Sequence, residues 1–191
     1  STGTLNDVNL EVDFNIQDRK IQIVDVFGTF ECKNINITYM EGMPEIIDIN
    51  GTANIENTKV TFDINSGNSN DLNIMSGNVD LYDLDTDFEK AKIDLYIQSE
   101  NSYLVDYLKL TEIEQDNYNK LQDIEGDVNL NLKLDFPLLV DLKAEEINYS
   151  ADAKIINGYY KLFDNRYGLE SFDIKINVKP DLVLSLIHIS E

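Results

Sequence analysis

The sequence predicts a mainly β protein made of amphipathic strands, and three observations support this. Residues 126–138 alternate strictly between apolar and polar side chains, which places the apolar ones on one face of a strand. The same alternation recurs along most of the 191 residues. Asn, Asp and Gly fill the short gaps between alternating runs, which is typical of turns. The apolar positions of the 126–138 strand are Val128, Leu130, Leu132, Leu134 and Phe136.

The first half of the chain reads as a series of strands. Residues 7–16 alternate and residues 21–23 resume after a polar turn at 17–20, which predicts a hairpin. The apolar phase slips by one at Val24 and Val26, which indicates a β-bulge. Residues 66–71 predict a polar loop. Further strands are expected at 35–39, 47–55, 60–64, 72–74, 79–81 and 91–97.

One helical segment is expected near residues 102–121. Leu104, Tyr107 and Leu108 have the spacing of a helix face, and Ser102 is placed to cap it. Alternation returns at 126–138, and Pro137 marks the end of that strand or a sheet edge. Residues 140–144, 147–155 and 172–178 continue the strand pattern, with a turn predicted at Asn157 and Gly158.

Two short sequence motifs each occur twice in the chain, which predicts a repeated unit. Residues 7–10 and 127–130 share Asp-Val-Asn-Leu, and residues 53–57 and 153–157 share Ala-x-Ile-x-Asn. We expect one β module over 1–183, with a first unit at about 1–100, a helical break at about 101–122 and a partial second unit at about 123–183.

The two ends of the chain lead to separate expectations. The chain begins at Ser1 rather than Met, so we expect an internal part of a longer protein. Residues 185–191 depart from the acidic composition before them and resemble translated sequencing-adaptor read-through. We therefore expect that tail to be non-native and exclude it from functional reasoning. The alternative is a genuine final strand.

The composition makes some classes of function unlikely for this chain. The 36 acidic and 15 basic residues give a net charge of −21, a field that repels phosphate backbones and anionic membrane surfaces. We therefore expect no nucleic-acid partner and interpret the acidity as a solvated outer face, with cation storage as the alternative. Hydrophobic residues make up 42% of the chain, which is enough to bury apolar surface.

The sequence gives little support for a catalytic site. A nucleophilic triad needs a base, and the only histidine, His188, lies in the suspect tail. Cys32, the only cysteine, sits in a strand-like run and is interpreted as a structural thiol. We expect no catalytic residue, no cofactor and no enzymatic activity. An enzyme acting on envelope glycans would need two carboxylates converging about 5–9 Å apart.

The densest acidic cluster consists of Asp83, Asp85 and Asp87. Carboxylates at alternate positions can chelate Ca²⁺ in an EF-hand loop, but that loop has Gly at its sixth position and Glu at its twelfth. Phe88 and Asp94 stand there instead. We interpret the cluster as solvated and predict no metal site, with weak Ca²⁺ binding as the alternative.

Four segments together resemble AsmA-like proteins, above all the YhdP-type branch, to which TamB is more distantly related. These are residues 49–64 (INGTANIENTKVTFDI), 76–84 (SGNVDLYDL), 103–110 (YLVDYLKL) and 124–139 (IEGDVNLNLKLDFPLL). The resemblance covers most of residues 1–183. Its motifs are degenerate β patterns, so there is no catalytic residue to carry over.

The resemblance implies an elongated antiparallel β-sheet, curled into a taco-like groove with an apolar inner face. It also implies a periplasmic module of a protein anchored in the inner membrane of a Gram-negative bacterium, which helps phospholipids move toward the outer membrane. Phospholipid acyl chains are then the expected partner. The residues expected to line the groove are Val8, Leu10, Val12, Phe14, Ile93, Leu95, Val128, Leu130, Leu132, Leu134, Phe136, Ile174 and Ile176.

A structural or adhesive β-solenoid or sandwich is the alternative function. The same alternation would serve a core filled by the protein's own side chains. Geometry discriminates between the two, because a fully occupied apolar interior argues against a lipid trough.

Overall fold

The computed structural model describes residues 1–39, 42–110, 119, 121–143, 146–162, 165–179 and 182–190, with side-chain surroundings given up to residue 160 and at Tyr167 and Gly168. It contains ten strands and one helix within these ranges. They are β1 (Thr2–Gln17), β2 (Lys20–Ile37), β3 (Ile46–Glu56), β4 (Lys59–Ser69), β5 (Leu72–Tyr82), β6 (Lys90–Glu100), α1 (Asn101–Leu108), β7 (Ile124–Pro137), β8 (Asn148–Leu162), β9 (Asn165–Lys179) and β10 (Leu182–Ser190).

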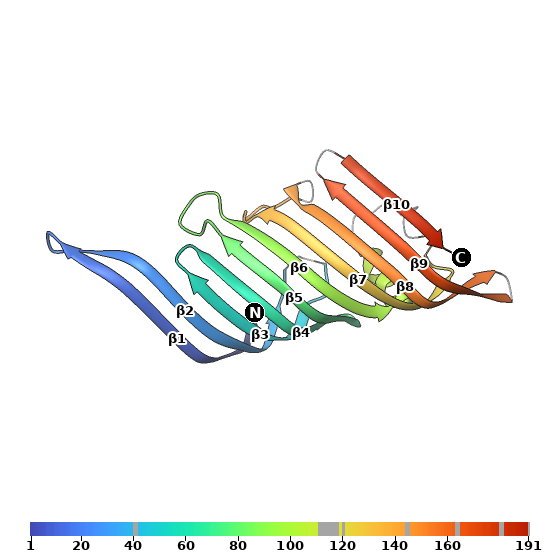
Figure 1. Ribbon diagram of the computed structural model, residues 1–191, viewed down its shortest axis with the longest axis horizontal. Helices are drawn as coiled ribbons and strands as arrows, with labels where there is room; N and C mark the ends of the chain where they lie inside the picture. The colour runs from blue at the N-terminus through green and yellow to red at the C-terminus, as the bar shows by residue number, and fades with distance from the viewer. Residues whose placement is uncertain are drawn as a thin grey trace.

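The strands form one antiparallel sheet in which spatial order equals sequence order, from β1 at one edge to β10 at the other (Figure 1). In the described parts of the chain the two edge strands do not pair with each other, so the sheet stays open. The prediction of a mainly β, open antiparallel sheet with one short helix is therefore confirmed.

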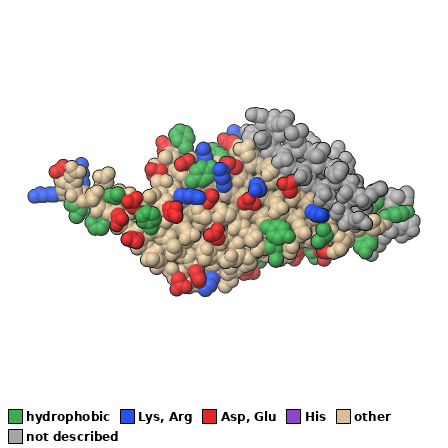
Figure 2. All heavy atoms as spheres, viewed as in Figure 1, with side chains coloured by type: hydrophobic (Ala, Val, Ile, Leu, Met, Phe, Trp, Pro, Cys, Tyr) green, Lys and Arg blue, Asp and Glu red, His purple; other side chains and the backbone are tan. Residues whose placement is uncertain are grey.

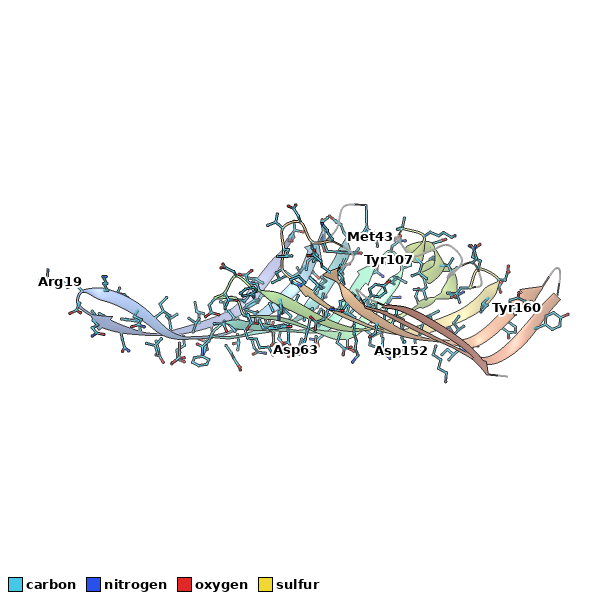
Figure 3. The ribbon with its side chains drawn as sticks, turned by 90° about the horizontal axis from the view of Figure 1, so that it is seen from above. Arg19, Met43, Asp63, Tyr107, Asp152 and Tyr160 are labelled. Carbon is cyan, nitrogen blue, oxygen red and sulfur yellow. The ribbon has the colours of Figure 1, made fainter. Side chains whose placement is uncertain are left out.

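The strand registers gather the apolar side chains onto one face. Leu132 of β7 lies between Leu95 of β6 and Ala151 of β8, and Leu95 in turn lies opposite Gly77 of β5. Because alternate residues point to opposite faces, each such row collects side chains of one kind. We call the side that packs against α1 the inner face. Asp63 and Asp152 project from the opposite, outer face (Figure 3).

Bulges bend the strands. Asp7 of β1, Asn34 of β2 and Asp48 of β3 have φ values of 47°, 50° and 54° and lie at shifts in register. Each extra residue bends its strand and increases the local twist. The bulge predicted near Val24 is confirmed, because Asp13 pairs with Asp25 and Phe14 pairs with Ile23. The bulges at Asp7, Asn34 and Asp48 were not predicted, because the pattern of apolar residues in the sequence did not indicate them.

Two predicted connections are wrong. Residues 66–69 belong to β4, and the chain reverses only at Asn70 and Asp71, whose φ values are 49° and 67°. A two-residue turn with positive φ at both positions suffices because Asn and Asp tolerate that conformation. The turn predicted at Asn157 and Gly158 lies instead within β8, where Asn157 has a φ of 52°.

The helix prediction is confirmed over Asn101–Leu108, but Ser102 does not cap it. The N-cap is Glu100, with no side-chain capping bond. Asn101 instead donates from Nδ2 to the carbonyl oxygens of Leu121 and Ile124, at 2.8 and 2.6 Å. The expected second part of the helical break, 111–118 and 120, lies outside the described residues.

The strand pattern expected at 140–144 does not form a strand over its described part. Residues 138–143 are turn and coil after Pro137, while Ala144 lies outside the described residues. Proline lacks a ladder donor, which explains why β7 ends there.

Candidate functional site

The inner face is bounded by two rows of strand ends, which differ in how they are covered. We define the helix rim as the strand ends at Thr2, Ile37, Ile46, Ser69, Leu72, Glu100, Ile124, Leu162 and Asn165. The turn rim consists of the opposite ends at Gln17, Lys20, Glu56, Lys59, Tyr82, Lys90, Pro137 and Asn148. The apolar rows of the face run across the strands between these rims.

The inner face is closed near the helix rim. Leu104 and Val105 of α1 are 6% and 4% exposed and pack in one cluster with side chains from β5 to β8. Burying such side chains removes apolar area from water and stabilises the fold. The sheet residues of this cluster are Leu72, Ile74, Leu95, Ile97, Ile124, Val128, Leu130, Ala153 and Ile155, joined by Leu121 from the connection after α1.

The inner face opens toward the turn rim. Along β7, exposure rises from 2% at Val128 and 8% at Leu130 to half-buried at Leu132, Leu134 and Phe136. The neighbouring strands follow the same trend, with Ala53 and Ala91 as exceptions because their side chains are small. Their half-buried members are Val60, Phe62, Val79, Leu81, Ile93 and Tyr149.

The apolar surface continues onto a protruding hairpin. Strand β3 pairs with β2 only from Phe27 onward, so residues 13–25 form a two-stranded overhang with no third strand (Figure 1). Asn57 fixes this boundary, because its side-chain oxygen accepts a 2.8 Å hydrogen bond from the Val26 N–H. Along the overhang Phe14, Ile16, Ile21 and Ile23 are 56–71% exposed.

The residues predicted to line the groove fall into three groups. Ile93, Leu95, Val128, Leu130, Leu132, Leu134 and Phe136 share adjacent rows on the central inner face. Leu10, Val12 and Phe14 extend that face along β1 and the overhang, opposite Gly28, Val26 and Ile23.

The structure gives less information on the remaining three residues, Val8, Ile174 and Ile176. Val8 lies within the register shift beside Asp7 and is 64% exposed. The backbones of Ile174 and Ile176 pair with Ala153 and Ala151, in the same rows, while their side chains lie outside the described set. The lipid role of all thirteen residues stays a prediction.

Sequence reasoning missed both the cover and some of the lining. Phe62 and Val79 lie in the row of Ile93 and Leu134, and Leu81 lies in the next row, that of Ala91 and Phe136. Their alternation was visible in the sequence. The position of α1 over the sheet was not visible, because a short amphipathic helix does not specify which strands it covers.

A pair of tyrosines links α1 to the connection between β2 and β3. The hydroxyls of Tyr39, in the β2–β3 connection, and Tyr107, in α1, share a hydrogen bond. Burial and then this hydrogen bond raise the pKa of Tyr39 well above its usual range. Figure 3 shows Tyr107 and Met43 on the side of the sheet opposite Asp63 and Asp152. The β2–β3 connection and α1 thus meet above the inner face.

The reactive side chains that the sequence singled out, Cys32 and the aspartates of the β5–β6 connection, do not come together in one site. Cys32 is 8% exposed, and burial raises the pKa of its thiol, which disfavours the nucleophilic thiolate. Asp83, Asp85 and Asp87 are exposed in the β5–β6 connection. Within the described residues, no group of three or more His, Cys, Asp or Glu side chains is arranged to hold a metal ion.

A comparison with models of known protein families identifies the family of this chain. A family model described as YhdP protein matches residues 1–181. The chain belongs to the YhdP family. The predicted membership of the AsmA-like, YhdP-type group is confirmed, and that family is one of bacterial envelope proteins. Neither the curated proteins nor the solved structures contain a match. No helix in the described part of this YhdP-family chain is long and apolar enough to cross a membrane.

Proposed function

We propose that this chain is a non-enzymatic groove module that carries phospholipid acyl chains between the inner and outer membranes. It would act in the periplasm as part of a longer protein anchored in the inner membrane. The observation that carries the proposal is the apolar inner face, which is continuous from strand to strand and half-exposed toward the turn rim. A contiguous exposed apolar surface is typical of a site that binds a partner.

The dimensions and energies suit an acyl chain. Six strands from β3 to β8 span about 24 Å at the usual strand spacing of about 4.8 Å. Each buried CH₂ group contributes about 0.8 kcal/mol, so a sixteen-carbon chain gains on the order of 10 kcal/mol before the entropic cost. Because neighbouring rows offer similar side chains, a bound chain can slide from row to row without leaving a deep site.

The covered half of the groove supports a second function, that of a structural module with a self-filled core. Under α1 the inner face is occupied by the protein's own side chains, with Val128 and Ile155 2% and 0% exposed. The half-exposed rows at Leu134 and Phe136 favour the lipid function instead, because a filled core would have buried them.

Photocrosslinking tests the proposal. A photoreactive residue replaces Leu134, on the inner face, or its outward neighbour Lys133, and the purified chain is mixed with vesicles of phosphatidylethanolamine and phosphatidylglycerol. We expect lipid adducts at position 134 and few at position 133, detected by mass spectrometry. Absence of an adduct at 134, or equal yields at both positions, would contradict a lipid groove.

A further inference from the structure

We propose that two copies of this chain associate through the uncovered edge of β2 on the overhang, as an antiparallel pair of strands centred on Gln22. The inference concerns an interface and does not depend on what the groove carries. Three observations carry it, namely a short backbone edge that no described strand covers, apolar residues that match each other across a two-fold axis, and a matching arrangement of charge.

The first observation is an uncovered edge of defined length. Strand β3 pairs with β2 only up to Phe27, and Asn57 ends the ladder, because its N–H donates a 2.7 Å hydrogen bond to the carbonyl oxygen of Val26. Beyond this point no described strand pairs with residues 20–25 on this side, and the overhang projects past the β3–β4 turn (Figure 1). Both limits of this gap lie within the chain, one at the turn of the overhang and one at Asn57.

The hairpin turn determines which backbone groups face the gap. Gln17 pairs with Lys20 across the two-residue turn 18–19, where the φ values are 52° and 62°. The pair that flanks such a turn exchanges hydrogen bonds, and the pairs then alternate along the hairpin. Ile21 and Ile23 therefore direct their N–H and C=O groups away from β1 and into the gap. An edge of this kind is a template for a further strand, because its donors and acceptors are already aligned.

The second observation is that this edge is complementary to itself. In an antiparallel pair centred on Gln22, Ile21 of each copy lies opposite Ile23 of the other. These are the residues whose backbone groups face the gap, so both pairs can exchange their N–H and C=O hydrogen bonds. A patch that matches itself about a two-fold axis is what a closed dimer requires.

The same register brings apolar side chains together. Opposite residues of an antiparallel pair point to one face, so Ile21 and Ile23 of both copies lie on a continuation of the inner face, flanked by Ile16 and Phe14 of their own hairpins. In one copy Ile21 and Ile23 are 71% and 62% exposed. Pairing gives each of them an apolar neighbour on its uncovered side, which removes apolar area from water.

The third observation is the arrangement of charge. Asp13 and Asp25 lie directly opposite each other in the overhang, and like charges in such a pair are destabilising. In the proposed register Arg19 of one copy comes beside Asp25 of the other. Arg19 lies at the tip of the overhang (Figure 3), and none of the described carboxylates forms an ion pair with it. The two-fold axis supplies this contact twice, which offsets the like-charge pair in each copy.

A second overhang also fits the space beyond the β3–β4 hairpin. In the proposed pair, β2 of the second copy continues in line with β3 and its β1 continues in line with β4. The turn 18–19 of one copy then meets the turn 57–58 of the other. A contact of this length is small beside the roughly 800 Å² per partner of a standard interface, so the association is weak and reversible in dilute solution.

Disulfide trapping tests the register. Cys32, the only cysteine, is first replaced by alanine. Gln22→Cys then places two thiols across the two-fold axis, within the Cα separation of about 7 Å that a disulfide needs. Asn15→Cys is the matched control, because Asn15 lies opposite Gln22 on the same face but belongs to β1, away from the gap. With copper phenanthroline as the oxidant, we expect position 22 to give about tenfold more disulfide-linked dimer than position 15 on non-reducing gels.

Two further variants of the Gln22→Cys chain test the contacts. Ile21→Pro removes an N–H that faces the gap and none that pairs with β1, so it should abolish trapping while the far-UV circular dichroism stays unchanged. Arg19→Asp should lower the yield about threefold, as an exposed charge pair allows. Combining Arg19→Asp with Asp25→Arg should restore the yield, because the two opposite charges are then exchanged between the positions.

Three outcomes would overturn the proposal. Equal yields at positions 22 and 15 would mean that the chains collide without a defined register. Trapping that survives Ile21→Pro would mean that the dimer forms without this edge. No disulfide at position 22, even in concentrated protein, would mean that a second copy does not cover the gap. None of these outcomes affects the lipid adduct expected at position 134, so the dimer and the lipid function fail separately.

Discussion

At the scale of single residues, the asparagines and aspartates shape the sheet. Among the described residues ten non-glycine positions have positive φ, and Arg19 is the one that is neither Asn nor Asp. Neighbouring amides hold two of the bulges: the N–H of Asn34 donates to Asn50 Oδ1 at 3.2 Å, and that of Asp48 donates to Asn36 Oδ1 at 3.1 Å. Since these residues adopt left-handed conformations more readily than others, the Asn-rich and Asp-rich composition is partly a requirement of strand geometry.

Gly51 is predicted to be intolerant of any side chain. A Cβ at this position would lie 2.2 Å from the backbone oxygen of Asp63 on the neighbouring strand, and a backbone atom cannot move aside cheaply. Gly51→Ala should therefore lower the free energy of unfolding by about 1–3 kcal/mol, the usual cost of overpacking, measured by urea denaturation. Gly168→Ala is the control, because the nearest described atom to its Cβ would be Tyr159 Cε1, at 4.0 Å. Equal stability of the two variants would contradict the prediction.

Asp80 is predicted to make a pH-dependent contribution to stability. Desolvation acts to raise its pKa, but the hydrogen bond from Thr61 and the contact with Lys59, at 2.7 and 3.0 Å, together lower it. A carboxylate with a lowered folded pKa stabilises the fold above its unfolded pKa, and this stability is lost as pH falls through the folded value.

Asp80→Asn should therefore be less stable than the unsubstituted chain at pH 7, with the gap closing as pH falls below the usual range of Asp. Thermal melts across that range measure the gap. Asp87→Asn, in the exposed β5–β6 connection, serves as the control and should leave stability unchanged at each pH. A gap for Asp80→Asn that persists at low pH would show that the lost contacts are not electrostatic.

At the scale of elements, period-two alternation was sufficient to predict most strands, while their lengths and connections required tertiary information. Gly67, Asn68 and Ser69 carry no large apolar side chain, yet they pair along the ladder with β5 because the backbone hydrogen bonds do not depend on side-chain type. Conversely, the alternation at 140–144 formed no strand in its described part, because Pro137 ends the ladder. The residues of the inner face were predictable from alternation, but the cover over them was not, because it depends on where α1 packs.

Leu104 is predicted to hold α1 on the sheet. Its side chain is 6% exposed and lies in the cluster with Ile97 and Leu130. Leu104→Ala should lower the free energy of unfolding by about 2–5 kcal/mol, since a buried leucine leaves both lost burial and a cavity. Val140→Ala, at a fully exposed position, should change it by less than about 0.5 kcal/mol. Chemical denaturation monitored by tyrosine fluorescence distinguishes these outcomes, and similar small effects would mean that α1 is not held by this contact.

At the scale of the whole molecule, the charge of −21 is spread over a thin, open sheet. Outer-face ion pairs, such as the one between Lys133 and Asp94 at 2.8 Å, offset little of it, because exposed pairs contribute at most about 1 kcal/mol. Figure 2 shows acidic and basic side chains interspersed among uncharged ones on this view, with carboxylates more numerous. Most of the excess negative charge therefore repels itself through solvent.

Salt is predicted to stabilise the chain. Raising NaCl from about 0.01 M to about 0.5 M shortens the Debye length from about 30 Å to a few Å, which screens repulsion among the carboxylates. The Tm should rise over this range at pH 7, measured by circular dichroism. A sodium sulfate series at matched ionic strength separates screening from salting-out, which would give a larger effect with sulfate. A Tm that falls with NaCl would mean that attractive pairs outweigh the repulsion.

The sequential strand order has a consequence for how such a sheet can change in length. Each described strand pairs only with its neighbours in the chain, so no pairing between distant strands fixes their total number. Deleting β3 and β4 would bring β2 beside β5, which runs in the direction that β3 did, and the antiparallel pattern would survive. Deleting one strand would place two parallel strands side by side, which a short turn cannot connect. Insertions and deletions compatible with this fold therefore come as whole hairpins, so the sheet can grow or shrink in steps of two strands.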